Sequence, residues 1–391
     1  MSLKRNIRIL TWFNFLTDFK LYAPVAIIYF SNVSHSYALG ATVFSITMVS
    51  AAIFDVPAGI YSDIIGRKRT VVLGALFAVL CTIFYAIGLS FWFLAIGAVF
   101  EGLSRAFYSG NNSALLHNIL SEEGLVDEFH SYSGRLGSMF QLALGISALL
   151  GGFIANWSFP ALMWLSVLPQ IGCLLLATLI IDSHQLEEQK ENILTLLKNA
   201  IKGFKENNNL RLLTISGMLD YGLGETSYQF QAAFYQTIVP IWFIGVAKTL
   251  SGILAAVSFY ISGKVIDRFG ALKVVLFRDV FTRIVNLISL IIPTKISPVL
   301  ISSTSLAFGV GTTAQGALLQ KEFTERQRAT IASLNSFGNS ITFSIALYLT
   351  GLIANKYGPF MALLATQVFL IPSDYYQFKF LARLRKAKKF S

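Results

Sequence analysis

Long apolar segments follow one another along almost the whole chain, separated by short polar connections. Each has roughly the 20 residues that an α-helix needs to cross the hydrocarbon core of a bilayer. They lie at about 7–30, 39–61, 69–89, 91–115, 134–156, 160–182, 209–238, 245–264, 271–292, 297–318, 330–354 and 358–380. The sequence therefore predicts an all-α membrane protein with twelve transmembrane helices.

The composition argues against a soluble or nucleic-acid-binding protein. Of 391 residues, 54% are hydrophobic and 13% are charged, about half the charged share of an ordinary soluble domain. The net charge of +11 does not indicate nucleic acid, because the basic residues lie between the apolar segments. Cys81 and Cys173 fall within apolar runs and no metal-ligand or cofactor motif is present, so neither a metal nor a cofactor is expected.

Lysines and arginines are concentrated in alternate connections, and the intervening ones hold only Lys248, Lys295 and Lys356. Because cytoplasmic loops carry the excess of basic residues, we expect both termini and the long middle loop in the cytoplasm and the protein in the cell (inner) membrane. The middle loop, 183–208, is predicted to link two six-helix bundles, 1–182 and 209–391, and to contain an amphipathic helix. The basic tail is expected to contact anionic lipid.

A short pattern occurs once in each predicted bundle, at 59–69 and at 263–273. Each copy closes one apolar segment and opens the next. The shared positions are Gly59, Asp63 and Gly66 in the first copy and Gly263, Asp267 and Gly270 in the second. A chain built from two related sets of hydrophobic segments is typical of secondary transporters.

The first copy, with Phe54 and Asp55 shortly before it and Arg67 after it, resembles the signature between the second and third helices of the major facilitator superfamily. The stretches 101–110 and 328–333 are most similar to the branch with drug and metabolite permeases. The resemblance covers the whole chain and implies alternating access. It also implies a cytoplasmic gate that stabilises the outward-facing state, carried here by Gly59, Asp63, Gly66 and Arg67.

The residue types fit such a gate. Gly59 is expected to let its helix approach a neighbour closely, and Gly66 to permit the turn before Arg67. The second copy lacks basic residues directly after Gly270, which predicts a weaker latch. Asp55 is expected to pair with the gate rather than with a substrate. The alternative is a solvated turn that carries cytoplasmic positive charges and has no gating role.

Polar and ionisable residues within the apolar segments supply the candidate substrate and proton site, because a charge that faces lipid is costly. These candidates are Asp18, Tyr22, Glu101, Arg105, Asp220, Glu225 and Gln229. Their segments are the first, fourth and seventh, which the resemblance implies to line the central cavity.

The spacing of the candidates suggests their roles. Asp18 shares a predicted helix face with Tyr22 and lacks a cation on that face, so we expect it to exchange protons. Glu101 and Arg105 are four residues apart and are expected to form an ion pair, either structural or for substrate coupling. Asp279 and Arg283 repeat that spacing in the ninth segment and are expected to form a structural ion pair.

The functional expectation is secondary active transport of a small molecule by a monomer, with proton-coupled export of an amphipathic or cationic compound as the first choice. The alternative is a symporter or uniporter for a nutrient or metabolite, in which Arg105 meets an anionic or hydroxylated substrate. A membrane-embedded enzyme is a remote alternative, because the sequence lacks a nucleophile elbow or aspartate-rich metal motif. A non-transporting receptor is an equally remote alternative.

Overall fold

The computed structural model of the chain describes residues 3–109, 111–122, 124–125, 128–181, 208–320 and 325–387. These residues form helices joined by short turns, and no strand occurs among them, so the predicted all-helical class is confirmed. The predicted linker, 183–208, lies outside the described residues except for Asn208. The amphipathic helix expected there stays a prediction.

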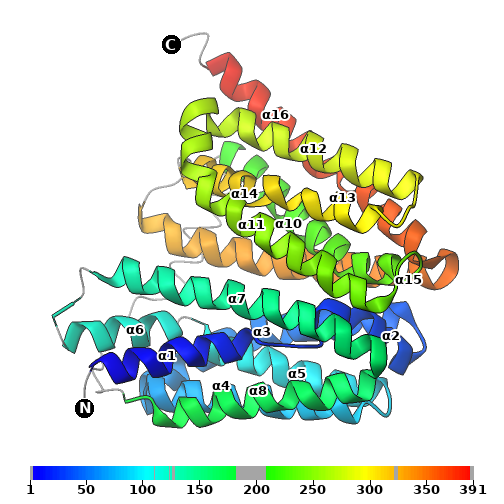
Figure 1. Cartoon of the computed structure of the whole chain (residues 1–391). Helices are drawn as coiled ribbons and strands as arrows, with labels where there is room; N and C mark the ends of the chain where they lie inside the picture. Colours follow the sequence, from blue (N-terminus) through cyan, green and yellow to red (C-terminus); the bar gives the residue numbers. More distant parts are fainter. Residues whose placement is uncertain are drawn as a thin grey trace. The chain divides into compact units, whose positions relative to one another are not determined.

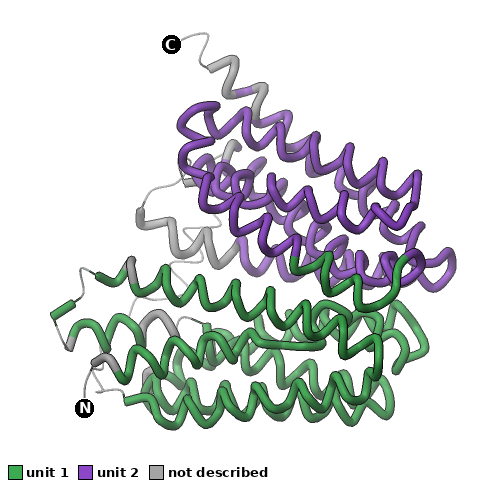
Figure 2. The backbone as a smooth tube through the Cα atoms, viewed as in Figure 1, with its two compact units in different colours: residues 1–188, 239–249 green, residues 189–238, 250–391 purple. Residues whose placement is uncertain are grey.

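The described residues divide into two compact units (Figure 2). Unit 1 comprises residues 1–188 with 239–249, and unit 2 comprises residues 189–238 with 250–391. The segment 239–249 thus packs with unit 1, although it follows the first helix of unit 2 in the chain.

Unit 1 is an assembly of helices around a small apolar core (Figure 1). Its elements are α1 (Leu3–Asp18), the 3-10 helix η1 (Ala23–Val25), α2 (Ala26–Ser34), α3 (Tyr37–Ile65), α4 (Arg67–Ile87), α5 (Phe91–Tyr108), α6 (Asn111–Glu122), α7 (Phe129–Trp157) and α8 (Phe159–Leu179). Leu10, Phe13, Val71, Leu116 and Cys173 join α1, α4, α6 and α8 in this core.

The first apolar segment, 7–30, was expected to be one helix, but the structure shows it interrupted. α1 ends at Asp18, the chain passes through an irregular stretch and η1, and α2 starts at Ala26. Pro24 gives the physical reason, because a proline has no amide hydrogen and its ring collides with the carbonyl four residues earlier, here that of Lys20. The predicted common helix face of Asp18 and Tyr22 is therefore wrong.

Unit 2 contains α10 (Asn208–Tyr235), most of α11 (Ile241–Phe269), α12 (Ala271–Ile291), α13 (Ser297–Ser303), α14 (Ser305–Gln320), α15 (Glu325–Phe369) and α16 (Ile371–Ala387). The predicted segment 297–318 is interrupted at Thr304, between α13 and α14. The range of α15 contains two helices that meet at Gly358, where φ is 83° and ψ is 167°. The last predicted segment, 358–380, starts there and continues into α16.

The repeated pattern has the same backbone conformation in both copies. Gly66 ends α3 with φ 92° and ψ 152°, and Gly270 begins α12 with φ 81° and ψ 138°. L-residues rarely adopt this region, so glycine is required at both junctions. The expected turn at Gly66 is confirmed, and the two copies are alike in structure as well as in sequence.

Six helices of the described part are long and apolar enough to cross a membrane. Large apolar side chains are exposed along them, for example those of Ile53, Leu168 and Ile253. Exposed apolar surface of this kind suits contact with lipid chains. The count of twelve spans and the cytoplasmic termini stay predictions.

Candidate functional site

In unit 1, Glu101 lies on α5 where that helix packs closely on its two neighbours. A Cβ atom added at Gly102 would lie 2.7 Å from the carbonyl oxygen of Thr47 on α3, and one at Gly97 would lie 2.7 Å from the Tyr85 ring on α4. Because both glycines lack that atom, the three helices approach one another closely on either side of Glu101. The carboxylate is consequently placed between helices rather than at the lipid surface.

The Glu101 carboxylate is held by three side chains from three elements. Its Oε1 accepts hydrogen bonds from Lys20 Nζ at 2.8 Å and from Arg105 Nη2 at 3.3 Å, and its Oε2 accepts one from the Tyr85 hydroxyl at 3.0 Å. The predicted Glu101–Arg105 pair is therefore present, but Lys20 makes the shorter contact. Hydrogen bonds from cations to a carboxylate are stronger than neutral ones, so Glu101 is firmly anchored as an anion.

Lys20 reaches Glu101 because the first segment is broken. Its backbone nitrogen bonds to the Asp18 carbonyl at 2.9 Å, and its carbonyl accepts from Ala23 at 3.1 Å, so the residue lies in the irregular stretch between α1 and η1. Gly151 on α7 supports this stretch, since a Cβ there would overlap the carbonyl oxygen of Leu21. The break and the close approach of α7 together orient the lysine.

Asp18 is the last residue of α1 and is partly buried. Among the described residues its carboxyl group takes part in no ion pair, because Lys20 and Arg105 both contact Glu101 instead. A helix C-terminus carries a partial negative charge, which is unfavourable for a second negative charge. Asp18 thus lies near two cations and makes no ion pair within the described part of the chain.

Tyr22 lies against the same cluster. Its side chain is 4% exposed, and its ring meets that of Tyr85 edge-on with a centroid distance of 5.6 Å. The buried Tyr22 hydroxyl has the Cys81 thiol as its neighbour. A thiol is a weak hydrogen-bond partner, so this hydroxyl is a candidate for contact with a bound solute.

In unit 2, the polar residues predicted on the seventh segment lie on two different sides of α10. Glu225 and Gln229 are half-buried, next to the exposed rings of Tyr221 and Tyr228. The Asp220 carboxylate lies instead 3.1 Å from Arg278 Nη2 of α12. Five residues correspond to well over one helical turn, which separates Asp220 from the face that carries Glu225.

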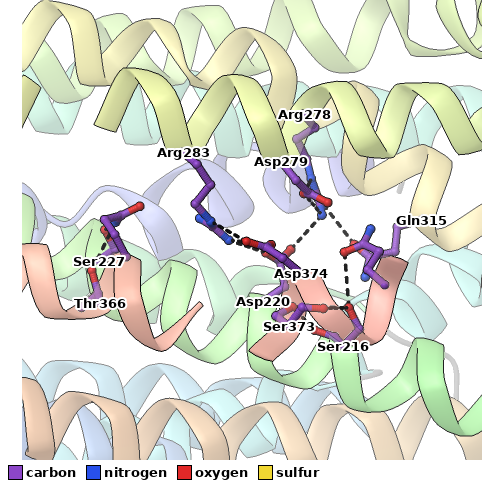
Figure 3. A network of polar contacts seen from close by, with 12 residues as sticks. Ser216, Asp220, Ser227, Arg278, Asp279, Arg283, Gln315, Thr366, Ser373 and Asp374 are labelled. Carbon is purple, nitrogen blue, oxygen red and sulfur yellow. Dashed lines mark hydrogen bonds and ion pairs between the residues drawn. The ribbon is translucent and has the colours of Figure 1, made fainter. Parts of the chain in front are cut away.

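The predicted ion pair between Asp279 and Arg283 is wrong. Asp279 pairs with the adjacent Arg278, at 2.7 Å, and Arg283 pairs with Asp374 of α16, at 3.2 Å (Figure 3). Arg278 can be buried there because Gly311 of α14 leaves room for it, since a Cβ at that glycine would overlap Arg278 Cδ. Arg283 thus pairs with another helix, whereas Asp279 pairs with its neighbour on α12.

The predicted gate residues of the first copy lie at the end of α3 and the start of α4. Gly59 is exposed and a Cβ there would meet no atom within 4 Å, so the close approach expected of it is not observed. Arg67 donates to the Asn118 side chain of α6 at 2.6 Å. Asp55 is exposed on α3, and the Asp63 side chain lies outside the described part of the chain.

The second copy lies at the end of α11 and the start of α12. Gly263 and Asp267 are exposed near the end of α11, and a Cβ at Gly263 would likewise meet no atom within 4 Å. Only Gly270 has a conformational requirement, its positive φ. The latch roles of both copies stay predictions.

Two residues of the unit 1 cluster were not found from the sequence. The contact of Lys20 with Glu101 was not predicted, because the first segment was expected to be one continuous helix, although Pro24 is a readable signal for the break. Tyr85 carries no sequence signal, because only the packing of α4 on α5 brings its hydroxyl to Glu101.

Comparisons with known proteins agree with this architecture. A family model described as Major Facilitator Superfamily matches residues 9–347. An uncharacterized MFS-type transporter of Methanocaldococcus jannaschii is 23% identical over 377 residues, which cover 91% of this chain and 94% of that protein. An uncharacterized transporter of Buchnera aphidicola is 28% identical over 145 residues, only 37% of this chain and 36% of that protein.

Several solved structures have the same fold at low sequence identity. A variant of the nucleoside transporter NupG matches with a TM-score of 0.83 and 14% identity, covering 97% of this chain and 99% of that chain. A D-xylose-proton symporter matches with a TM-score of 0.72 and 12% identity, covering 97% and 98%. At these identities the likeness concerns the fold alone.

Proposed function

The chain belongs to the Major Facilitator Superfamily and is a membrane transporter rather than an enzyme, and we propose that it carries a small hydroxylated or anionic metabolite together with protons. The solute-binding site that we propose is the cluster around Glu101 in unit 1. The family resemblance found in the sequence is confirmed by the match over residues 9–347.

The exposure of the Arg105 guanidinium group is the observation that carries the proposal. Its side chain is 48% exposed, against 12% for Glu101, and it makes one long hydrogen bond of 3.3 Å within the described part of the chain. A guanidinium has five N–H donors in a rigid fork, so most of them are available to a solute. Carboxylate, phosphate and hydroxyl oxygens are the acceptors that such a fork binds well.

The charge of the cluster supports the same class of solute. When Asp18 is protonated, Lys20 and Arg105 supply two positive charges against the single carboxylate of Glu101. A cationic solute would be repelled by the excess, whereas an anion or a polyol would be attracted. Solved structures of the same fold include a nucleoside transporter and a D-xylose-proton symporter, both for hydroxyl-rich solutes.

Asp18 is the residue that we propose to carry the coupling proton in this site. It lies two residues from Lys20 and is partly buried without an ion pair among the described residues. Protonation removes a charge that burial and the end of α1 both disfavour. An anionic solute bound to Arg105 would offset part of the positive charge near Asp18 and thereby favour the protonated form of Asp18.

Export of an amphipathic or cationic compound is the second candidate, and one observation favours it. On α10, Glu225 lies beside Tyr228, and the rings of Tyr221 and Tyr228 are both exposed. Aromatic rings next to a carboxylate can bind an organic cation.

Whichever solute is carried, we also propose a gate role for Asp63 and Asp267. We further propose cytoplasmic termini, a location in the inner membrane and a monomeric state.

Transport by purified protein in liposomes distinguishes the two candidates. The probes are a nucleoside, D-xylose, a dicarboxylate and a quaternary ammonium compound, each with and without an imposed proton gradient. The proposal expects uptake of one of the first three to be driven by inward proton movement. Uptake of the quaternary ammonium compound alone, driven by outward proton movement, would favour the export candidate.

A further inference from the structure

A cluster of charged side chains joins three helices of unit 2 and is not part of the site proposed above. We call it the unit 2 network. Its members are Asp220 of α10, Arg278, Asp279 and Arg283 of α12, and Asp374 of α16 (Figure 3).

Each arginine of the unit 2 network has one preferred carboxylate. Arg278 contacts Asp279 Oδ1 with Nε at 2.8 Å and with Nη2 at 2.7 Å. Arg283 binds both oxygens of Asp374, with Nε to Oδ2 at 3.2 Å and Nη2 to Oδ1 at 3.3 Å. Arg278 therefore pairs mainly with Asp279, and Arg283 pairs mainly with Asp374.

Asp220 is the third carboxylate and lies between the two pairs. Its Oδ2 is 3.1 Å from Arg278 Nη2, and its Oδ1 is 3.8 Å from Arg283 Nη2. These contacts are longer than the preferred pair of Arg278. Asp220 thus contacts both arginines, each of which also pairs more closely with another carboxylate.

The charges of the unit 2 network do not balance. Three carboxylates face two guanidinium groups, so the fully ionised network carries one negative charge in excess. The side chains are 24% exposed or less, and that of Asp279 is only 6% exposed. Arg278 and Asp279 are buried and the other three members are partly buried. An unbalanced charge in such surroundings is disfavoured, and addition of one proton removes it.

The surrounding helices supply no further cation to the unit 2 network among their described side chains. From α14, Gln315 accepts a hydrogen bond from Arg278 Nη1 at 3.0 Å, and α13 has no charged residue. From α11, which packs on α12, the charged side chains in unit 2 are Lys264, Asp267 and Arg268, all exposed. The other described charged side chains of α10, α12, α15 and α16 are Arg211, which contacts Asn208; Glu225, which interacts with Tyr228; Lys273 and Arg383, both exposed; Lys356, over Tyr357; and Lys379, over Tyr375.

We propose that the unit 2 network binds one proton, shared by its three carboxylates. Interacting acids titrate as a set, so the proton belongs to the network rather than to one residue. Asp220 and Asp374 are the more exposed members, at 24% and 20%, and give the proton access to the buried Asp279. The chain thereby has a proton-binding centre in unit 2 that does not depend on Asp18 or on any solute.

The test is infrared spectroscopy of the full chain in lipid nanodiscs, in an Asp18→Asn parent that removes the candidate acid of unit 1. Spectra are compared between about pH 6.5 and pH 9, a range in which ordinary carboxyl groups stay ionised. The expected result is a carbonyl stretching band of a protonated carboxyl group that is lost at the higher pH. Complete absence of such a band in the folded parent would overturn the proposal.

Variants that change the charge count give opposite effects. Asp220→Asn, Asp279→Asn and Asp374→Asn each balance the network, and each should abolish the band. Arg283→Gln leaves two carboxylates in excess and should strengthen it. Asp267→Asn, an exposed carboxylate of the same unit, is the matched control and should leave the band unchanged.

Circular dichroism and gel filtration establish which variants fold, and the three asparagine variants serve as replacements for one another. Persistence of the band in every folded asparagine variant would show that the proton lies elsewhere and would contradict the proposal. Because no solute is present, this result is independent of whether the Glu101 cluster binds a metabolite.

Discussion

The ammonium nitrogen of Lys20 lies 2.8 Å from Oε1 of Glu101, although the two residues are 81 positions apart in the chain. The contact depends on the break after Asp18, which lets the backbone of residue 20 leave the helical path. It is the shortest of the three hydrogen bonds to the Glu101 carboxylate. The position of Lys20 against Glu101 thus depends on the interruption of the first segment before Pro24.

Replacement of Lys20 should weaken both stability and transport. Lys20→Met leaves the mostly buried Glu101 with Arg105 and Tyr85. We expect a loss of about 2–3 kcal/mol in the free energy of unfolding, because removal of one partner leaves a buried charge incompletely compensated. Thermal unfolding in nanodiscs measures the loss. Lys295→Met, at an exposed position, is the control and should be neutral; equal effects of both substitutions would refute the role of Lys20.

Asp18→Asn should eliminate solute-driven proton movement, because the amide cannot carry a proton between the two sides of the membrane. Fluorescence of a pH-sensitive dye inside proteoliposomes reports the movement. Glu128→Gln, an exposed carboxylate before α7, provides the comparison and should transport protons normally. Unchanged proton movement in Asp18→Asn would exclude this residue as the carrier.

The two copies of the glycine pattern should respond to alanine in the same way. Gly66→Ala and Gly270→Ala place a Cβ on a backbone with φ near 92° and 81°, and each should cost about 1–3 kcal/mol of stability. Gly59→Ala and Gly263→Ala are helical positions facing open space, and alanine there should be neutral or stabilising by up to about 1 kcal/mol. Melting temperatures of the four variants check the contrast, which must vanish if the turn conformation is unimportant.

The gate prediction concerns transport rather than folding. Asp63→Asn should abolish or strongly reduce transport while expression stays normal, and Asp267→Asn should have the smaller effect, because no basic residue directly follows Gly270. Uptake rates normalised to protein in the membrane measure the difference. Full activity of Asp63→Asn would remove the basis for a latch.

Local signals in the sequence predicted the local features of the structure. The repeated glycines foretold the turn at Gly66, and four-residue spacing foretold the contact of Glu101 with Arg105. Pro24 also carried a readable signal, a helix break, but the uniform hydropathy of 7–30 concealed it. Hydropathy reports where a segment lies and says little about whether it is one helix.

Contacts between distant segments were beyond reach for a physical reason. Arg283 has an acid four residues before it, yet it binds Asp374, 91 positions away. Along one helix, the side chain of Asp279 is taken by its neighbour Arg278, so the choice depends on which helices pack together. Tyr85 and Lys20 reach Glu101 through the same kind of packing, which a single sequence does not encode as spacing.

The central claim is that Arg105 contacts the transported solute, and binding to purified protein tests it most directly. The probes are a nucleoside, D-xylose, a dicarboxylate and a quaternary ammonium compound, titrated against wild type, Arg105→Gln and Arg135→Gln, the last an exposed arginine of the same unit that lies over Tyr132. We predict that a hydroxylated or anionic probe binds wild type and Arg135→Gln alike and loses at least about tenfold in affinity with Arg105→Gln, since a hydrogen bond to a charged group contributes about 1.5–3 kcal/mol. Equal affinity of Arg105→Gln and wild type for such a probe, or binding of the quaternary ammonium compound alone, would contradict the account.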